Sequence, residues 1–149
     1  MAIWQFSCYI IPKKNVTADM ELGSDEILFW GRQSSSPERI AFLEKQKSWS
    51  DNISQYGKSD ETCIEFFYQN ENLADISCRL DLRSLSKKML EKIIEYIQEI
   101  DGMILYENRI YNPDMEQIVE AMKKSKAARF CQNPVRFLDE APGRNLTDS

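Results

Sequence analysis

The clearest pattern of apolar and polar positions lies between residues 73 and 107. Residues 73–83 alternate between apolar and polar side chains, which is typical of a strand with one buried face. Residues 84–101 repeat apolar side chains at helical spacing, and residues 102–107 form a second short apolar run. The pattern predicts a strand, a helix and another strand, with Gly102 ending the helix in a left-handed conformation.

Shorter patterns predict further strands before this region. Residues 3–11 alternate in polarity and residues 62–69 are rich in aromatic and branched side chains, so both ranges predict strands. Residues 70–72 favour a hairpin turn, which makes the strand at 62–69 an antiparallel neighbour of the strand that follows it. The apolar run at residues 26–30 predicts a short strand that pairs with the first one.

A helix signal also stands at residues 36–47. Ser36 suits the cap and Pro37 the first position of a short helix that fades near residue 47. The residues that follow, 48–51, predict a loop that is anchored by the indole of Trp49.

The C-terminal part of the chain predicts helices and then a tail. Asn112 caps and Pro113 starts a helix, and residues 125–130 continue or restart it. Residues 133–138 predict a final turn that buries two apolar side chains. Residues 141–149 are polar and predict a flexible C-terminal tail.

The order of these elements predicts the α+β fold class. We expect an antiparallel or mixed sheet with helices on one face, on a ferredoxin-like split βαβ plan with additions and a helical C-terminus. The helices should cover the strand face that carries Ile76, Cys78 and Leu80, because these apolar side chains need a cover. The length of 149 residues suits a single domain, which we place at residues 1–140.

Composition narrows the chemistry that the chain can perform. It contains no histidine, so it lacks the usual general base near neutral pH and the Ser–His and Cys–His nucleophile pairs. Its four cysteines do not have metal-ligand spacing. Three of them, Cys8, Cys63 and Cys78, fall in predicted strands, where a thiol acts as a small apolar residue. These features favour a non-enzymatic protein with no metal and no cofactor.

Charge and hydropathy bound the partners and the compartment. The net charge of -5 offers no broad basic field to phosphate backbones, so nucleic-acid binding is disfavoured and a basic protein partner is mildly favoured. No apolar segment is long enough to span a bilayer, and no basic region precedes the first apolar run as in a signal peptide. We therefore expect no membrane association and a cytoplasmic location.

The candidate site is the polar face of the strand at residues 73–83. At a strand period of two, its charged and polar residues emerge on one face: Asp75, Ser77, Arg79, Asp81 and Arg83. If the first strand lies alongside, Tyr9 shares this surface with Gln5 and Ser7. Two guanidinium groups beside a carboxylate can bind charged groups of a partner or an anionic ligand. The alternative interpretation is an ion-paired, solvated sheet face, in which Asp81 is too acidic to act as a general base.

Three motifs together resemble a known group of proteins. They are Ser48-Trp49-Ser50 with Tyr56-Gly57 before a strand, Arg79-Leu-Asp81-Leu-Arg83 at a strand end, and Ser125-Lys-Ala-Ala-Arg-Phe130 followed by Asn133-Pro-Val-Arg-Phe-Leu138. The region from Trp49 to Leu138 is similar to small, poorly characterised bacterial cytosolic proteins that resemble the immunity components of polymorphic toxin systems. The resemblance implies a protein that binds a cognate toxin and blocks its active site. It assigns no binding residue, and it does not include residues 12–47.

The sequence therefore favours a non-enzymatic module that binds another protein, and an immunity protein that neutralises a cognate bacterial toxin is the sharpest form of this hypothesis. The predicted partner-binding residues are Tyr9, Asp75, Ser77, Arg79, Asp81 and Arg83. One alternative is a small-molecule or anion-binding domain, enzymatic or not, that uses the face of Arg79, Asp81 and Arg83. Another alternative is a structural subunit that assembles through an open sheet edge.

Overall fold

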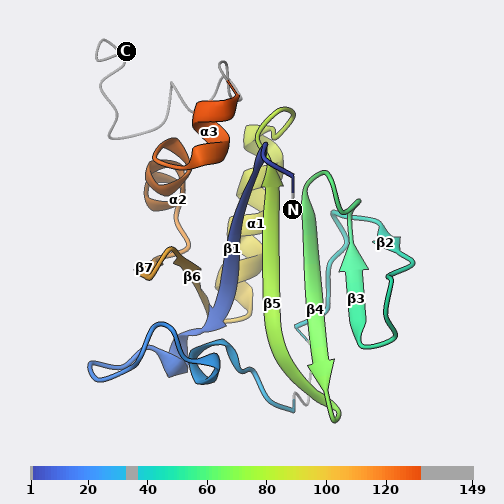
Figure 1. The fold of residues 1–149 in the computed structure, drawn as a ribbon, viewed down its shortest axis with the longest axis vertical. Coiled ribbons are helices and arrows are strands. Elements are labelled where there is room, and N and C mark those ends of the chain that lie inside the picture. Colours follow the sequence, from blue (N-terminus) through green and yellow to red (C-terminus); the bar gives the residue numbers. More distant parts are fainter. Residues whose placement is uncertain (1, 33–36, 132–149) are drawn as a thin grey trace.

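The strands form one antiparallel sheet. The computed structural model describes residues 2–32 and 37–131. In these ranges seven strands pair in the order β2-β3-β4-β5-β1-β6-β7, and each neighbouring pair is antiparallel (Figure 1). The strands are β1 (Gln5–Pro12), β2 (Lys45–Gln46), β3 (Ile53–Tyr56), β4 (Cys63–Gln69), β5 (Asn72–Asp81), β6 (Gly102–Tyr106) and β7 (Arg109–Tyr111).

Three α-helices and two 3₁₀-helices accompany the sheet in the described residues. The long helix α1 (Lys87–Glu99) lies behind the sheet in Figure 1, whereas α2 (Met115–Lys123) and α3 (Lys126–Phe130) lie on the side of β6 and β7. The 3₁₀-helices are η1 (Lys13–Asn15) and η2 (Asp25–Leu28). Nowhere in the described ranges is a helix both long and apolar enough to cross a membrane.

The centre of the sheet is a split β–α–β unit. β5 leads into α1 and then into β6, and β1 lies between these two strands, antiparallel to both. β4 and β5 form a hairpin whose turn residues, Asn70 and Glu71, both have positive φ angles, as a tight turn between twisted strands requires. The predicted α+β fold and the predicted antiparallel pairing of these two strands are confirmed.

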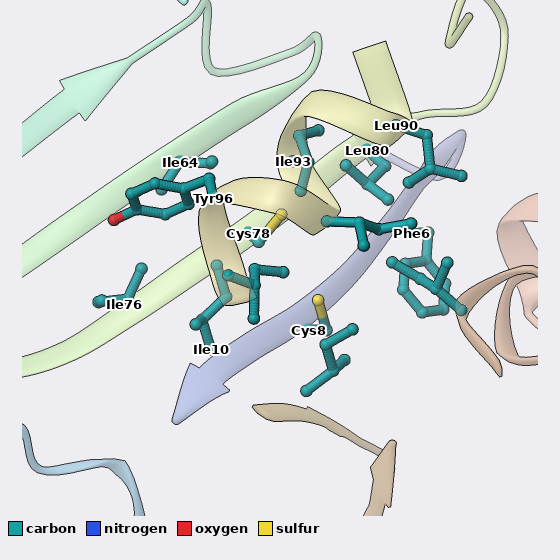
Figure 2. Close-up of a cluster of buried hydrophobic side chains, with 14 of the residues drawn as sticks. Phe6, Cys8, Ile10, Ile64, Ile76, Cys78, Leu80, Leu90, Ile93 and Tyr96 are labelled. Carbon is teal, nitrogen blue, oxygen red and sulfur yellow. The ribbon is translucent and has the colours of Figure 1, made fainter. Parts of the chain in front are cut away.

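The main hydrophobic core lies between α1 and the sheet (Figure 2). Ile76, Cys78 and Leu80 of β5 are almost fully buried against this helix. Phe6 and Ile10 of β1 extend the same layer. The helices contribute the opposite layer, which contains Leu90, Ile93, Tyr96, Ile97, Ile118, Val119 and Met122. Helices therefore cover the apolar face of β5, as the sequence pattern predicts, and Cys78 packs there as a small apolar residue.

The segment after β1 covers part of the opposite sheet face. Ile27 of η2 joins Ile11 and Leu105 in a second, smaller cluster of buried side chains. The predicted strand at residues 26–30 is wrong, because Asp25–Leu28 form a 3₁₀ turn and only Gly31 bridges to β5. The amide of Asn15 donates hydrogen bonds to backbone carbonyls of this segment, so those carbonyls are satisfied without a strand partner.

The predicted helix at residues 37–47 is also wrong. The described part of this segment is irregular until β2 begins at Lys45, and its predicted cap, Ser36, lies outside the described residues. Long-range hydrogen bonds hold it in place: Tyr96 donates to the carbonyl of Pro37 over 2.5 Å, and Tyr56 and Tyr68 each donate to the carboxylate of Glu38 over 2.7 Å. These contacts outweigh the local helix signal.

The loop between β2 and β3 corrects another expectation. The indole of Trp49 was expected to anchor it, but this residue is 82% exposed and so anchors nothing within the described structure. The Ser48 side chain holds the loop instead. Its hydroxyl group donates a hydrogen bond to the Ser50 carbonyl and accepts one from the Ser50 backbone amide.

Two predicted helix ends are displaced by one or two residues. Asp101, with a φ of 54°, takes the left-handed conformation after α1, and Gly102 is the first residue of β6. Glycine is needed at 102 for space, because a Cβ there would lie 3.0 Å from side-chain atoms of Ile10 and Ile97. Asp114, rather than Asn112, caps α2 through a hydrogen bond from the Gln117 amide. The turn predicted at 133–138 and the tail at 141–149 lie outside the described residues.

Candidate functional site

β1, β4 and β5 bring polar side chains together on the sheet face opposite α1. In the register of the sheet, Tyr9 pairs with Ser77 and Ser7 pairs with Arg79. Glu65 of β4 lies opposite Ser77 on its other side. Side chains alternate between the two faces of a strand, so these five residues share one face. The predicted proximity of Tyr9, Ser77 and Arg79 is correct, while their role in binding stays a prediction.

A groove of about 690 Å³ lies over this polar face. Tyr9, Ser77 and Arg79 line its floor, and its walls come from residues 22–28, the turn between β6 and β7, and the start of α3 at 125–127. The other predicted site residues are not part of its lining: Asp75, Asp81 and Arg83. The structure therefore divides the predicted set between a groove and the end of β5.

Arg79 forms an ion pair with Glu65 on the floor of the groove. Both side chains are mostly buried, with exposed fractions of 17% and 16%, and the Arg79 guanidinium also lies 3.5 Å from the sulfur of Cys63. The expectation that Arg79 flanks Asp81 is wrong, because the cross-strand neighbour Glu65 neutralises it instead. An incoming anion would have to compete with this carboxylate for the guanidinium.

Asp81 and Arg83 form a separate ion pair at the end of β5. Asp81 is only 1% exposed and accepts three hydrogen bonds of 2.9–3.0 Å from Arg83, one from its backbone and two from its guanidinium. The guanidinium also lies 3.8 Å from the ring centre of Trp4 and donates to the carbonyl of Asp60. Burial alone would raise the pKa of Asp81, but the hydrogen bonds from Arg83 outweigh it and lower this pKa, as the sequence predicts.

The pKa of Asp75, on the same strand, is shifted in the opposite direction to that of Asp81. In the described ranges its carboxylate has no ion pair and no hydrogen bond. Its partial burial raises its pKa, and the charges of Asp25 and Glu65 raise it further. Burial and the charges of Asp75 and Asp25 also raise the pKa of Tyr9. The surroundings of Asp75 therefore disfavour the charged form of its carboxyl group.

Asp75→Asn is expected to stabilise the protein at pH 7. A carboxyl group whose pKa is raised in the folded state does not destabilise the protein below its ordinary pKa of 3.8. It destabilises the protein fully once the pH is above its folded-state pKa. The amide removes that penalty, and we expect a gain of roughly 0.2–1 kcal/mol, the range for cross-strand charge pairs. Urea unfolding at pH 7 and pH 3 checks this, because the gain should vanish at pH 3. A less stable variant at pH 7 would contradict it.

Asp81→Asn is expected to act in the opposite direction. Hydrogen bonds to a charged group are worth about 1.5–3 kcal/mol, and we expect a loss of this size at pH 7. Because the folded-state pKa of Asp81 is lowered, its stabilisation is present above pH 3.8 and is lost as the pH falls through the lower folded value. The deficit of the variant should therefore shrink in acid, measured by the same urea titrations. An equal deficit at every pH would show that packing, and not charge, is responsible.

The thiols near the groove are poor nucleophiles. Cys63 is fully buried, and burial raises its pKa to about 11. Cys78 lies in the main core, where a hydrogen bond to Cys8 and burial also raise its pKa. Among the described residues, no group of three or more histidine, cysteine, aspartate or glutamate side chains could hold a metal ion.

Sequence reasoning missed two charged residues that the fold brings to the groove. Asp25 and Lys126 line the groove from segments that are far from β5 in the sequence, so no pattern places them there. Trp49 is strongly exposed, and its only sequence signal is a tryptophan between two serines in a polar stretch. Tyr9 remains 39% exposed on the groove floor. Exposed aromatic side chains of this kind are enriched in protein interfaces.

Comparison with known proteins yields no matching family model, no similar curated protein and no similar solved structure.

Proposed function

We propose that this protein is a non-enzymatic module that binds another protein, and that its partner is a cognate bacterial toxin. The observation that carries the proposal is the groove on the sheet face opposite α1. Its floor consists of paired strands, and the ion pair of Arg79 and Glu65 fixes charged groups within it. Groups held in this way favour specific recognition, because little conformational freedom is lost on binding.

Exposed aromatic side chains support protein recognition. Tyr9 lies on the groove floor, and Trp49 projects from the loop between β2 and β3. Tyrosine and tryptophan dominate the energetics of many interfaces, because each buries a large area while losing little side-chain freedom. A partner that covers either residue would remove an aromatic surface from water.

The resemblance of residues 49–138 to immunity proteins supports a toxin as the partner. Immunity proteins block the active site of a toxin, and a net charge of -5 suits a toxin domain with a basic active-site surface. A cytoplasmic location belongs to the same proposal.

Small-molecule binding is the second candidate function. The groove volume of about 690 Å³ falls within the usual range for ligand sites, which favours this alternative. The pairing of Arg79 with Glu65 and of Arg83 with Asp81 weighs against an anionic ligand. A screen of metabolites by thermal shift tests the alternative, since a ligand that binds only the folded state must raise its melting temperature.

The decisive experiment isolates the partner and then measures inhibition. Tagged full-length protein is used to capture partners from a native lysate, and each stoichiometric partner is purified and assayed for toxicity or enzymatic activity. The proposal expects a 1:1 complex and loss of the partner's activity at one equivalent. A tight complex that leaves the activity unchanged would overturn toxin neutralisation, and the absence of any stoichiometric partner would overturn the binding proposal as a whole.

A further inference from the structure

On the polar sheet face, the carboxylates outnumber the arginines that pair with them. Arg79 is paired with Glu65, and Arg83 is paired with Asp81. Within residues 2–32 and 37–131, Asp25 and Asp75 have neither an ion pair nor a hydrogen bond through their side chains. The acidic character of this face is therefore concentrated where η2 meets β1 and β5.

The same part of the groove also offers apolar contact surface. Tyr9 presents its ring on the floor, and Leu22, Leu28 and Leu105 contribute aliphatic walls. An arginine or lysine side chain needs this combination, because its alkyl stem packs on apolar groups while its cationic end reaches a carboxylate or the face of a ring. An anionic or purely apolar ligand would leave Asp25 in the lining, and Asp75 just outside it, without a partner.

We propose that the groove receives a basic segment of the partner protein, with an arginine or lysine side chain seated on Tyr9 beside Asp25, at the end of the groove next to Asp75, which lies just outside its lining. This inference rests on the proposed protein-binding function and specifies the chemistry of the partner. Charge complementarity is its basis: Arg79 and Arg83 are already paired within the fold, whereas Asp25 and Asp75 have no ion pair within the described residues. On the other walls, Lys126 and Glu107 add one charge of each sign and do not alter this balance.

The electrostatics of the unbound protein agree with this geometry. The charges of Asp25 and Glu65, together with partial burial, disfavour the ionised form of Asp75 and raise its pKa. A cation in the groove would relieve this repulsion. Binding energy would then come partly from removing a cost that the unbound fold carries.

A small basic probe tests the chemistry of the groove without the natural partner. The full-length protein is titrated with N-acetyl-arginine amide and with N-acetyl-citrulline amide, which has nearly the same shape but no charge, and backbone amide resonances are followed by NMR. We expect saturable shifts centred on Tyr9 and Ser77 with the arginine probe, at least fivefold weaker binding for citrulline, and a similar loss in the double variant Asp25→Asn/Asp75→Asn. Equal binding of both probes, or no saturable shifts at Tyr9 and Ser77, would overturn the inference.

A matched variant separates a local effect from the overall charge. Glu91→Gln/Glu95→Gln removes the same two charges from the exposed surface of α1, on the other side of the sheet, and should leave probe binding within about twofold, as expected for exposed charges at this distance. If this control weakens binding as much as the groove variant does, the effect is a long-range one and the inference fails. The asparagine substitutions themselves should not impair folding, since Asp75→Asn is expected to stabilise the protein.

The affinity of the isolated partner for the same variants provides the second test. Its affinity should fall at least tenfold for Asp25→Asn/Asp75→Asn and by less than threefold for Glu91→Gln/Glu95→Gln. If the partner binds both variants as it binds the original protein, the groove inference is overturned while the protein-binding function stands. Trp49→Ala locates the interface in that case, because a loss of affinity there would place it at the loop between β2 and β3.

Discussion

Gly57→Ala is expected to lower the free energy of unfolding by about 3 kcal/mol. Gly57 follows β3 with a φ of 83°, a conformation that costs an alanine roughly 1–2 kcal/mol. Its Cβ would also collide with the carbonyl oxygen of Thr62 and lie 3.3 Å from the Cα of Cys63, where β4 begins. Neither backbone can move freely, because the Gly57 amide donates to Glu44 over 2.8 Å and Cys63 is fully buried. Overpacking of this kind adds about 1–3 kcal/mol.

Gly23→Ala is the matched control for this prediction. Gly23 is exposed, and a Cβ at this position would have no neighbour within 4 Å. Its substitution should change stability by less than about 1 kcal/mol, since it acts mainly on the unfolded chain. Urea unfolding of both variants at pH 7 makes the comparison. Similar stabilities for the two variants would show that the β3–β4 connection relaxes around the added methyl group.

Glu38→Ala is expected to cost about 3 kcal/mol and to release the segment that precedes β2. The Glu38 carboxylate accepts hydrogen bonds from the hydroxyl groups of Tyr56 and Tyr68, and Lys45 lies 3.4 Å away. Removing it breaks two charge-assisted hydrogen bonds and leaves partly or fully buried hydroxyl groups without this acceptor. Burial opposes ionisation of Glu38, yet these hydrogen bonds outweigh it and lower its pKa. Urea unfolding measures the loss of stability.

Limited trypsin digestion reports on the segment itself. Arg39 is exposed next to Glu38, so cleavage after it should become faster in Glu38→Ala at concentrations of urea that leave the sheet folded. Glu120→Ala is the control, because within the described residues this exposed glutamate forms an ion pair only with Lys124, the residue that follows α2, and its loss should cost less than about 0.5 kcal/mol. Unchanged cleavage at Arg39 would show that Tyr96 and the apolar contacts hold the segment without Glu38.

The sequence predicts well those elements of the fold that are specified by residues close together in the chain. The alternation of β5, the turn at Asn70 and Glu71 and the apolar stripe of α1 each lie within one short window. Together they predict the hairpin and the strand–helix–strand unit. The position of β1 between β5 and β6 is not contained in any such window, because it depends on which strands pair across more than 60 residues.

The failed predictions concern segments whose contacts are distant in the sequence. Residues 26–30 look like a strand, but the indole of Trp30 is held by the carbonyl of Ile10, 20 residues away. Residues 37–47 look like a helix, but the carbonyl of Pro37 is bound by Tyr96, 59 residues away. Local propensity is a weak preference, and tertiary contacts of this kind override it.

The candidate site was predicted in outline and not in its pairings. A period of two is enough to place Arg79 and Asp81 on one face of β5. It cannot show that Glu65 pairs with Arg79, because that contact depends on the register between β4 and β5. It also cannot bring Asp25 to the groove, since the sequence predicts a strand at residues 26–30 and not the 3₁₀ turn Asp25–Leu28.

The position of β1 has a consequence for synthesis on the ribosome. β1 precedes every other strand in the chain, yet both of its neighbours come much later, with β5 ending at Asp81 and β6 at Tyr106. The β4–β5 hairpin can form as soon as it emerges, whereas both edges of β1 stay unpaired until the chain has grown past these positions. At a translation rate of about 5–20 residues per second, this strand stays unpaired and prone to aggregation for several seconds. Slower translation of codons 70–106 should therefore lower the yield of soluble protein, and chaperones that shield nascent strands should restore it.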